Sequence, residues 1–323
     1  MSPDRHHPAP SHATAPPSMS EAAFRSLYDR LRAQALGGGT DRRRGTLSRI
    51  TPERVVAAAA GVRSGRTVSL AAPVETSPGP DDPHPASHSM IAPADGEADG
   101  HGLRFALDRF AMNVHGDADS HLDALCHVIF DGELYGGVPA STVTPDGAGA
   151  LTVDLVRDGI VGRGVLLDIP RLRGVPWLEP GDAVTADELA AAEVAQDVTV
   201  GPGDLLFVRV GHRLRRRSLG RWDTARARAG LHPNAMDFLA ERGVAALGSD
   251  GNNDTAPGVV ADVAFPVHVL AVQAMGMHLM DYLDFEELVP ACEQSGLRHF
   301  LCVVAPLRLP SATGSPVNPI AVL

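Results

Sequence analysis

Lysine is absent from this 323-residue sequence, and all 28 of its basic side chains are arginine. The 39 acidic residues outnumber them, which gives a formal net charge of −11 with neutral histidines. A chain of this charge lacks the basic surface with which proteins bind nucleic acid or anionic lipid, so we expect neither partner. Aromatic residues are scarce at 4%, so aliphatic groups must shape most of any binding pocket.

Cysteine and long apolar runs are also limited. Cys126, Cys292 and Cys302 are an odd number of widely spaced thiols, which fits a reducing compartment better than a disulfide framework. No apolar run reaches the length of a membrane span, and the N-terminus lacks a signal-peptide core. These absences predict a soluble, cytoplasmic protein.

The order of the segments predicts a disordered tail over residues 1–18 and one domain over residues 19–323. The tail is rich in Pro, Ser and His and has no hydrophobic period. In the domain, short apolar runs at 163–169 and 204–211 are typical of buried strands, and helical patterns lie between such runs. The alternation predicts an α/β or α+β fold.

Several other segments carry local signals. Helices are predicted over 20–36, 51–62, 185–196 and 231–243, and strands over 66–72, 104–114 and 244–250. The basic segment 212–217 is predicted to be an exposed loop. The long Pro/Gly/Asp-rich segment 74–100 has no period, and we expect either a disordered loop or a lid near the functional site.

Histidine and aspartate gather in one stretch after that segment. Alternate residues of an extended strand share a face, so His115, Asp117, Asp119, His121 and Asp123 would all point the same way. Imidazole nitrogens and carboxylate oxygens together suit Zn, Mn or Fe. A solvated strand is the ordinary alternative, but a solvent face rarely draws only His and Asp. The stretch therefore predicts a metal site.

A catalytic metal site has about three protein ligands and one open position. We expect His121 and Asp123 as ligands, with either Asp117 or His115 as the first ligand. His127 lies four residues past Asp123 and would approach the site without binding the same ion. Its imidazole, with a pKa near neutrality, can take a proton from water and return it to a leaving nitrogen. The sequence has no G-x-S-x-G elbow and no Gly-rich phosphate-binding loop, so we expect neither a serine hydrolase nor a nucleotide-dependent enzyme.

The segments SHLDALCH and FDGELYGG resemble the signature of the metal-dependent cyclase family, which includes bacterial kynurenine formamidase and isatin hydrolase. That signature is His-x-Gly-Thr-His-x-Asp-x-x-x-His, and His121, Asp123 and His127 match its second His, its Asp and its last His. Asp117 replaces the first His, which is a metal ligand in the family, and Asp119-Ser120 replaces Gly-Thr. The resemblance implies a single domain with a mixed central sheet or open barrel flanked by helices. It also implies a homodimer or homotetramer.

A second region of interest covers residues 266–296. His268 opens an apolar helical run, where a lone His is usually a core residue. Family members have a His here and a Glu-Asn pair about a dozen residues later, which complete a second metal site in the two-metal members. The resemblance implies that His268 is a ligand, but Asp281-Tyr282 replaces the pair and Asp is shorter than Glu. We therefore expect one metal ion, and we expect His115, Asp119 and Asp281 to contact a small-molecule substrate.

The sequence thus predicts a metal-dependent hydrolase that cleaves the carbon–nitrogen bond of an amide, formamide or lactam. It would use one Mn or Zn ion, or Fe, with His127 as general acid and base. Two alternatives stay open. One is a cyclase or lyase of specialised metabolism, in which the metal stabilises an enolate. The other is a catalytically inactive relative that binds a ligand, which the replacement of the first motif His by Asp117 would explain.

Overall fold

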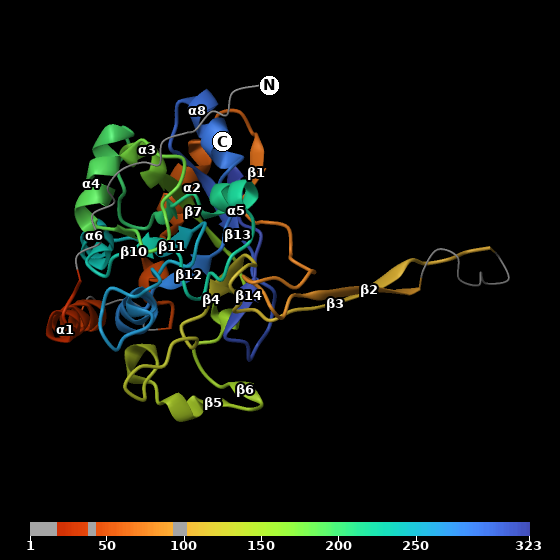
Figure 1. Cartoon of the computed structure of the whole chain (residues 1–323), viewed down its shortest axis with the longest axis horizontal. Helices are drawn as coiled ribbons and strands as arrows, with labels where there is room; N and C mark the ends of the chain where they lie inside the picture. The colour runs from red at the N-terminus through yellow and green to blue at the C-terminus, as the bar shows by residue number, and fades with distance from the viewer. Residues whose placement is uncertain (1–17, 38–42, 93–101) are drawn as a thin grey trace, which may run out of the picture.

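The computed structural model describes residues 18–37, 43–92 and 102–323. All but the last residue of the predicted disordered tail lies outside these ranges, as do residues 93–100 of the predicted loop. One nine-stranded sheet forms the centre, with helices packed around it (Figure 1). In spatial order its strands are β1 (Thr67–Ser69), β15 (Ile320–Val322), β13 (His299–Val304), β7 (Ile160–Asp168), β9 (Leu205–Arg209), β11 (Ala246–Ser249), β12 (His278–Asp281), β4 (His121–Asp123) and β14 (Gly314–Pro316).

The sheet is mixed. Strands β7, β9, β11 and β12 run parallel to one another, whereas β13, β15 and β1 on one side and β4 and β14 on the other are antiparallel to their neighbours. The parallel strands are apolar and buried, as expected for strands covered on both faces. In β9, Leu206 and Val208 join one hydrophobic core, and Leu205 and Phe207 join a second core across the sheet. This architecture confirms the predicted α/β fold with a mixed central sheet.

Most of the predicted helices are confirmed. Thr185 and Glu188 form the reciprocal capping box that opens α4, Thr51 caps α2, and α6 ends at Gly243 in the left-handed conformation. The helices are α1 (Glu21–Gly37), α2 (Pro52–Ala60), α3 (Ile169–Arg173), α4 (Ala186–Ala195), α5 (His212–Leu219), α6 (Ala235–Arg242), α7 (Pro266–His268) and α8 (Leu288–Ser295), with 3₁₀ turns at Gly45–Arg49, Tyr135–Gly137, Ala140–Thr142 and Val153–Val156 and a π-helix at Val269–Met275. Among the residues described, none of the helices combines the length and the hydropathy that crossing a bilayer requires.

The prediction of an exposed loop at 212–217 is wrong. These residues belong to α5, and its first turn is buried: Arg213 donates hydrogen bonds to the backbone carbonyls of Ala118, Tyr282 and Leu283. A buried guanidinium is stable because its donors meet backbone acceptors. The composition of the segment hid this, since arginine-rich stretches are usually solvated.

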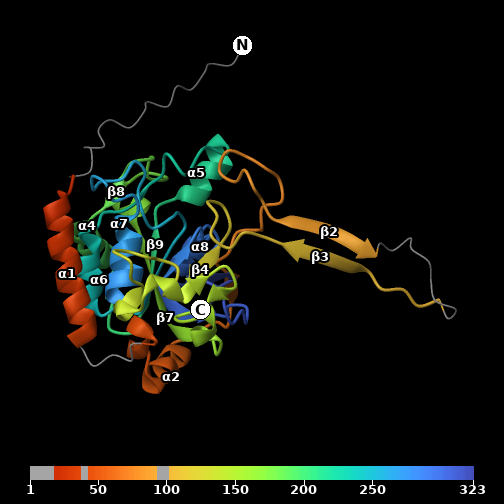
Figure 2. The same cartoon turned by 90° about the horizontal axis from the view of Figure 1, so that it is seen from below.

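The irregular loop predicted over 74–100 is only partly correct. Residues Ser87–Ala92 form β2, which pairs antiparallel with β3 (Leu107–Ala111) in a hairpin that stands away from the body (Figures 1 and 2). His88 on this hairpin pairs with Asp108 at 2.7 Å. Two further short pairs complete the described strands, β5 (Val143–Thr144) with β6 (Gly147–Ala148) and β8 (Ala183–Val184) with β10 (Gly230–Leu231).

Candidate metal centre

The pairing of β4 brings together residues far apart in sequence. His121 lies opposite Asp281 of β12, and Asp123 lies opposite Gly314 of β14. Residues opposite each other, and residues two apart on one strand, share a face of the sheet. His121, Asp123 and Asp281 therefore point to the same side, and the structure holds their ligand atoms within 4.8 Å of one another.

The extended strand predicted over 115–123 is correct only for its last three residues. Residues 114–119 are a series of bends, because the alternation of side chains is lost where no neighbouring strand pairs with the backbone. His115 nonetheless returns to the site. Gly314 makes room for it, since a Cβ atom there would lie 2.7 Å from the imidazole Cε1 of His115.

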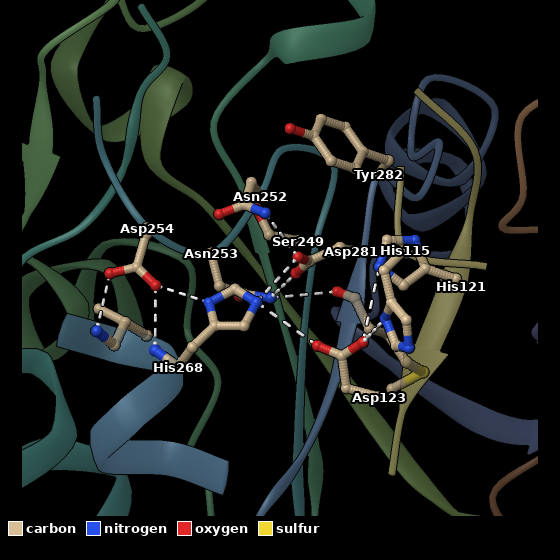
Figure 3. A network of polar contacts seen from close by, with 12 residues as sticks. His115, His121, Asp123, Ser249, Asn252, Asn253, Asp254, His268, Asp281 and Tyr282 are labelled. Atoms are coloured by element: carbon tan, nitrogen blue, oxygen red, sulfur yellow. Dashed lines mark hydrogen bonds and ion pairs between the residues drawn. The ribbon is translucent and has the colours of Figure 1, made fainter. Parts of the chain in front are cut away.

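Asp123 is the centre of the cluster, and three imidazoles face its carboxylate (Figure 3). His115 Nδ1 lies 2.9 Å and His121 Nε2 lies 3.6 Å from Asp123 Oδ1. His268 Nε2 lies 3.4 Å from Asp123 Oδ2 and 3.3 Å from Asp281 Oδ2. The structure thus brings together His115, His121, Asp123, His268 and Asp281 of the predicted site residues.

Two of these imidazoles are oriented by an acceptor on their far side. His121 Nδ1 donates to the backbone carbonyl of Asp119 at 2.8 Å, since a carbonyl can only accept. His268 Nδ1 lies 2.6 Å from Asp254 Oδ2, on the opposite side of the ring from Asp123 (Figure 3). With Nδ1 held by these acceptors, each ring turns its Nε2 toward the carboxylates, where a bound cation would take the Nε2 lone pair. Metal-binding histidines are held in this way.

Amide groups hold the second carboxylate. Asn252 Nδ2 donates to Asp281 Oδ2 at 2.9 Å, and Asn253 Nδ2 donates to Asp281 Oδ1. These donors fix the Asp281 side chain in the orientation that faces His268. The carboxylate of Asp281 therefore keeps a defined place beside Asp123 and His121.

The residues present fit a divalent cation. Both oxygens of Asp123 are buried and lack a hydrogen bond in proper geometry, although imidazole nitrogens lie near them. Burial would raise the pKa of Asp123, but His127, His115 and His268 together hold it well below its usual range. Burial would also lower the pKa of His268, but Asp281, Asp123 and Asp254 raise it well above its ordinary value. A cation bound among these groups would satisfy the Asp123 oxygens, which otherwise lack a hydrogen bond.

His127 lies at the edge of this cluster. Its ring stacks on that of His115, with centroids 3.6 Å apart and an interplanar angle of 10°, and it groups with His115 and Asp123 in a second set of ligand atoms. Burial lowers the pKa of His127 to about 4, although Asp123 opposes this shift. This pKa is lower than the near-neutral value expected from the sequence. Without a bound ion the imidazole is therefore neutral at pH 7 and can accept a proton.

The two remaining predicted residues lie elsewhere. Asp117 is outside both groups of ligand atoms and accepts a hydrogen bond from the Tyr282 hydroxyl at 2.9 Å. Burial and the Asp117 carboxylate raise the pKa of Tyr282 well above its usual value, which keeps this donor protonated. Asp119 turns away from the cavity, and its Oδ1 accepts from the backbone N–H of Glu75 at 2.8 Å.

A cavity of about 600 Å³ opens beside the cluster. Its polar wall includes His115, Asp117, His121, His127, Asn252, His268 and Asp281. Its apolar wall includes Val128, Ile129, Phe130, Val263, Phe265 and Val269. A pocket with a few convergent polar groups and an apolar wall is the usual form of a small-molecule site.

Comparison with known proteins agrees with this arrangement. Residues 48–253 match the model of the Cyclase family. The chain belongs to the cyclase family. A crystal structure described as that of a novel cyclase is 31% identical to it, with a TM-score of 0.79 over 92% of this chain and 99% of that one. No curated protein sequence matches this chain.

Isatin hydrolases share the fold at lower identity. Isatin hydrolase A from Labrenzia aggregata is 20% identical, with a TM-score of 0.56 over 79% of this chain and 93% of its own chain. Isatin hydrolase A from Ralstonia solanacearum is 24% identical, with a TM-score of 0.56 over 84% and 97% of the two chains. Both likenesses show that the chain shares its fold with these proteins over the parts that are covered.

Sequence reasoning missed the residues that orient the candidate metal ligands. Asn252, Asn253 and Asp254 follow β11 after two intervening residues. The neighbouring Asp250 is fully buried, and its Oδ1 accepts from the backbone N–H of Val210 at 2.6 Å. A run of three amide and acid side chains after a buried parallel strand was the available signal.

Proposed function

We propose that this protein is a metal-dependent hydrolase that cleaves the carbon–nitrogen bond of an amide, formamide or lactam. The observation that carries the proposal is the Asp123 carboxylate, which is buried without proper hydrogen bonds among oriented imidazoles. His121, His268 and Asp281 beside it line a cavity of about 600 Å³. The names of the isatin hydrolases that share the fold support hydrolysis over lyase chemistry.

His121, Asp123 and Asp281 would hold the ion, with His268 facing the same carboxylates. Mixed nitrogen and oxygen donors suit Mn or Zn, and Fe is compatible with the same set. When bound, such an ion lowers the pKa of water toward neutrality and polarises a substrate carbonyl. Asn252, Asn253 and Asp254 keep the ligands in place for it.

The protein's own groups complete the reaction. A neutral ring nitrogen of His127 takes the proton of the attacking water and later returns it to the leaving nitrogen. His115 stacks on this ring and limits its rotation, while Thr313 Oγ1 lies 2.9 Å from His115 Nε2 and fixes that ring in turn. The apolar wall at Phe130 and Val263 receives the carbon part of the substrate and excludes bulk water.

The test is hydrolysis of a panel of formamides and lactams by protein loaded with Mn or Zn in ¹⁸O-labelled water. We expect solvent oxygen in the product, which a lyase or cyclase reaction would not incorporate. His127→Ala should retain the metal and lose kcat by about a hundredfold or more. The control His299→Ala, on β13, should stay within a few-fold of the wild type. Turnover without labelled oxygen, or undiminished kcat in His127→Ala, would refute the proposal.

A further inference from the structure

A second, smaller cavity lies beside α5. It has a volume of about 320 Å³ and is here called the arginine pocket, because three arginines line it. Arg216 and Arg217 follow Arg213 at three and four residues, so the three side chains lie on one face of the helix. The remaining wall includes Asp284 and residues 72–75, in the loop ahead of β2 that passes beside α5 (Figure 2). A cavity of this size can hold a small molecule.

Two of these arginines are neutralised within the protein. Arg216 Nη2 lies 2.8 Å from Glu75 Oε2, and its Nε lies 2.6 Å from Asp81 Oδ2. Asp81 also pairs with a further arginine outside the lining. Arg217 pairs with Asp284. The lining therefore has three arginines against two carboxylates, and both carboxylates are already engaged.

Arg213 is the arginine that lacks a counter-ion. It is only 4% exposed. Its Nε and Nη2 atoms donate to backbone carbonyls, those of Leu283, Ala118 and Tyr282. Within residues 18–37, 43–92 and 102–323, no carboxylate forms an ion pair with this guanidinium and no acceptor meets its Nη1. The positive charge thus faces the pocket with only neutral groups bound to it.

The surroundings of Arg213 favour an added negative charge. Burial and the neighbouring Arg216 lower the pKa of Arg213, although nearby carboxylates oppose the shift. Asp119 is one acid in the vicinity, but its Oδ1 accepts from a backbone N–H rather than from Arg213. Buried charges in proteins are ordinarily paired, because an unpaired charge loses its hydration without compensation. An anion in the pocket would supply that pairing.

We propose that the arginine pocket binds a small oxyanion, either a carboxylate or a phosphate group, at the free Nη1 edge of Arg213. A planar guanidinium matches the oxygens of both groups. The site is separate from the metal cavity: Ala118 lines the arginine pocket, whereas Asp117 lines the metal cavity. Since Arg213 bridges the carbonyls of Ala118 and Tyr282, a bound anion would stabilise the segments that precede β4 and follow β12.

The first test is calorimetric titration of the full chain with inorganic phosphate and, separately, with acetate. Saturable binding of at least one probe is expected at one per chain, and the tighter probe identifies the class of anion. Val74 lines the pocket and is 44% exposed, so Val74→Glu places a carboxylate at the site without disturbing the core. It should weaken binding by about tenfold or more, the effect of losing a charge-assisted hydrogen bond. The matched control is Val56→Glu on α2, which changes the net charge equally and should keep the wild-type affinity.

The second test uses the arginines. Arg217→Gln removes the partner of Asp284 and leaves that carboxylate at the pocket, so the affinity should again fall by about tenfold or more. Arg226→Gln is the matched control, since it removes an exposed arginine paired with Asp223 elsewhere on the surface.

A third titration separates this site from the metal cavity. After removal of metal by a chelator, the wild type should bind the anion with unchanged affinity. The inference would be overturned by loss of binding on chelation, by no saturable binding of either probe, or by equal affinities in Val74→Glu and Val56→Glu. None of these measurements involves turnover, so the outcome is independent of the proposed reaction.

Discussion

Asp254→Asn tests what the orientation of His268 contributes to metal binding, because the imidazole itself is retained. Asp254 accepts from His268 Nδ1 at 2.6 Å and from the backbone N–H groups of Val267 and His268 at 2.7 and 3.0 Å. Both carboxylate oxygens of Asp254 accept hydrogen bonds, whereas an Asn side chain has only one acceptor oxygen. Asn also lacks the negative charge that holds the proton on His268 Nδ1. We expect the metal affinity to fall by about 10- to 100-fold, the usual effect of losing a group that orients a metal ligand.

That loss corresponds to about 1.4–2.7 kcal/mol of binding free energy. It is measured by calorimetric titration of metal-depleted protein with Mn²⁺ or Zn²⁺. The variant also loses part of a helix cap, which costs about 1 kcal/mol of folding stability. Thr185→Ala is the matched control, since it removes the cap of α4 at a similar cost and lies outside the cavity lining. Equal metal affinities for wild type and Asp254→Asn would refute the orienting role.

Three further predictions concern stability and reactivity. Burial lowers the pKa of His278 to about 4, against about 6.5 in the unfolded chain, so the unfolded state binds more protons between these values and stability falls as the pH drops below about 6.5. The free energy of unfolding should be lower by about 2 kcal/mol at pH 5. In denaturant unfolding, His278→Leu should therefore show a smaller difference in stability between pH 8 and pH 5 than the wild type does. An equal difference in the two proteins would contradict this prediction. Phe207→Ala, which removes a buried ring packed on Phe285 and Phe300 at centroid distances of 5.8 and 5.7 Å, should cost about 3–5 kcal/mol in the same assay, and a loss below 1 kcal/mol would contradict that packing. Burial raises the pKa of Cys126 and Cys292 to about 11, so the native protein should react slowly with a thiol reagent at pH 8 and release three equivalents per chain only after unfolding; fast labelling would show that the thiols are accessible.

The sequence predicted the elements whose stability is local. The capping box at Thr185 and Glu188 and the glycine after α6 satisfy backbone groups within a few residues, so they mark helix ends directly. Apolar runs marked β7 and β9 because parallel strands are buried on both faces. The burial of Arg213 could not be predicted in this way, since its three acceptors lie some 70 and 95 residues away in the chain.

The same distinction applies to the site. His121 and Asp123 share a short strand, and their common direction followed from the alternation of side chains. The approach of His115 did not, because it depends on the space that Gly314 leaves on a neighbouring strand. The amides that clamp Asp281 also come from a separate loop, and only the register of β11, β12 and β4 brings them together.

The most direct measurement is the metal content of protein purified without chelators, by elemental analysis, beside Asp123→Asn and the distant control Asp237→Asn on α6. We predict about one Mn, Zn or Fe per chain in the wild type and in Asp237→Asn, and a loss of at least tenfold in occupancy for Asp123→Asn. All three proteins should keep the same secondary structure by circular dichroism. No metal in the wild type after reconstitution, or equal metal in Asp123→Asn, would contradict the assignment of this cluster as a metal centre.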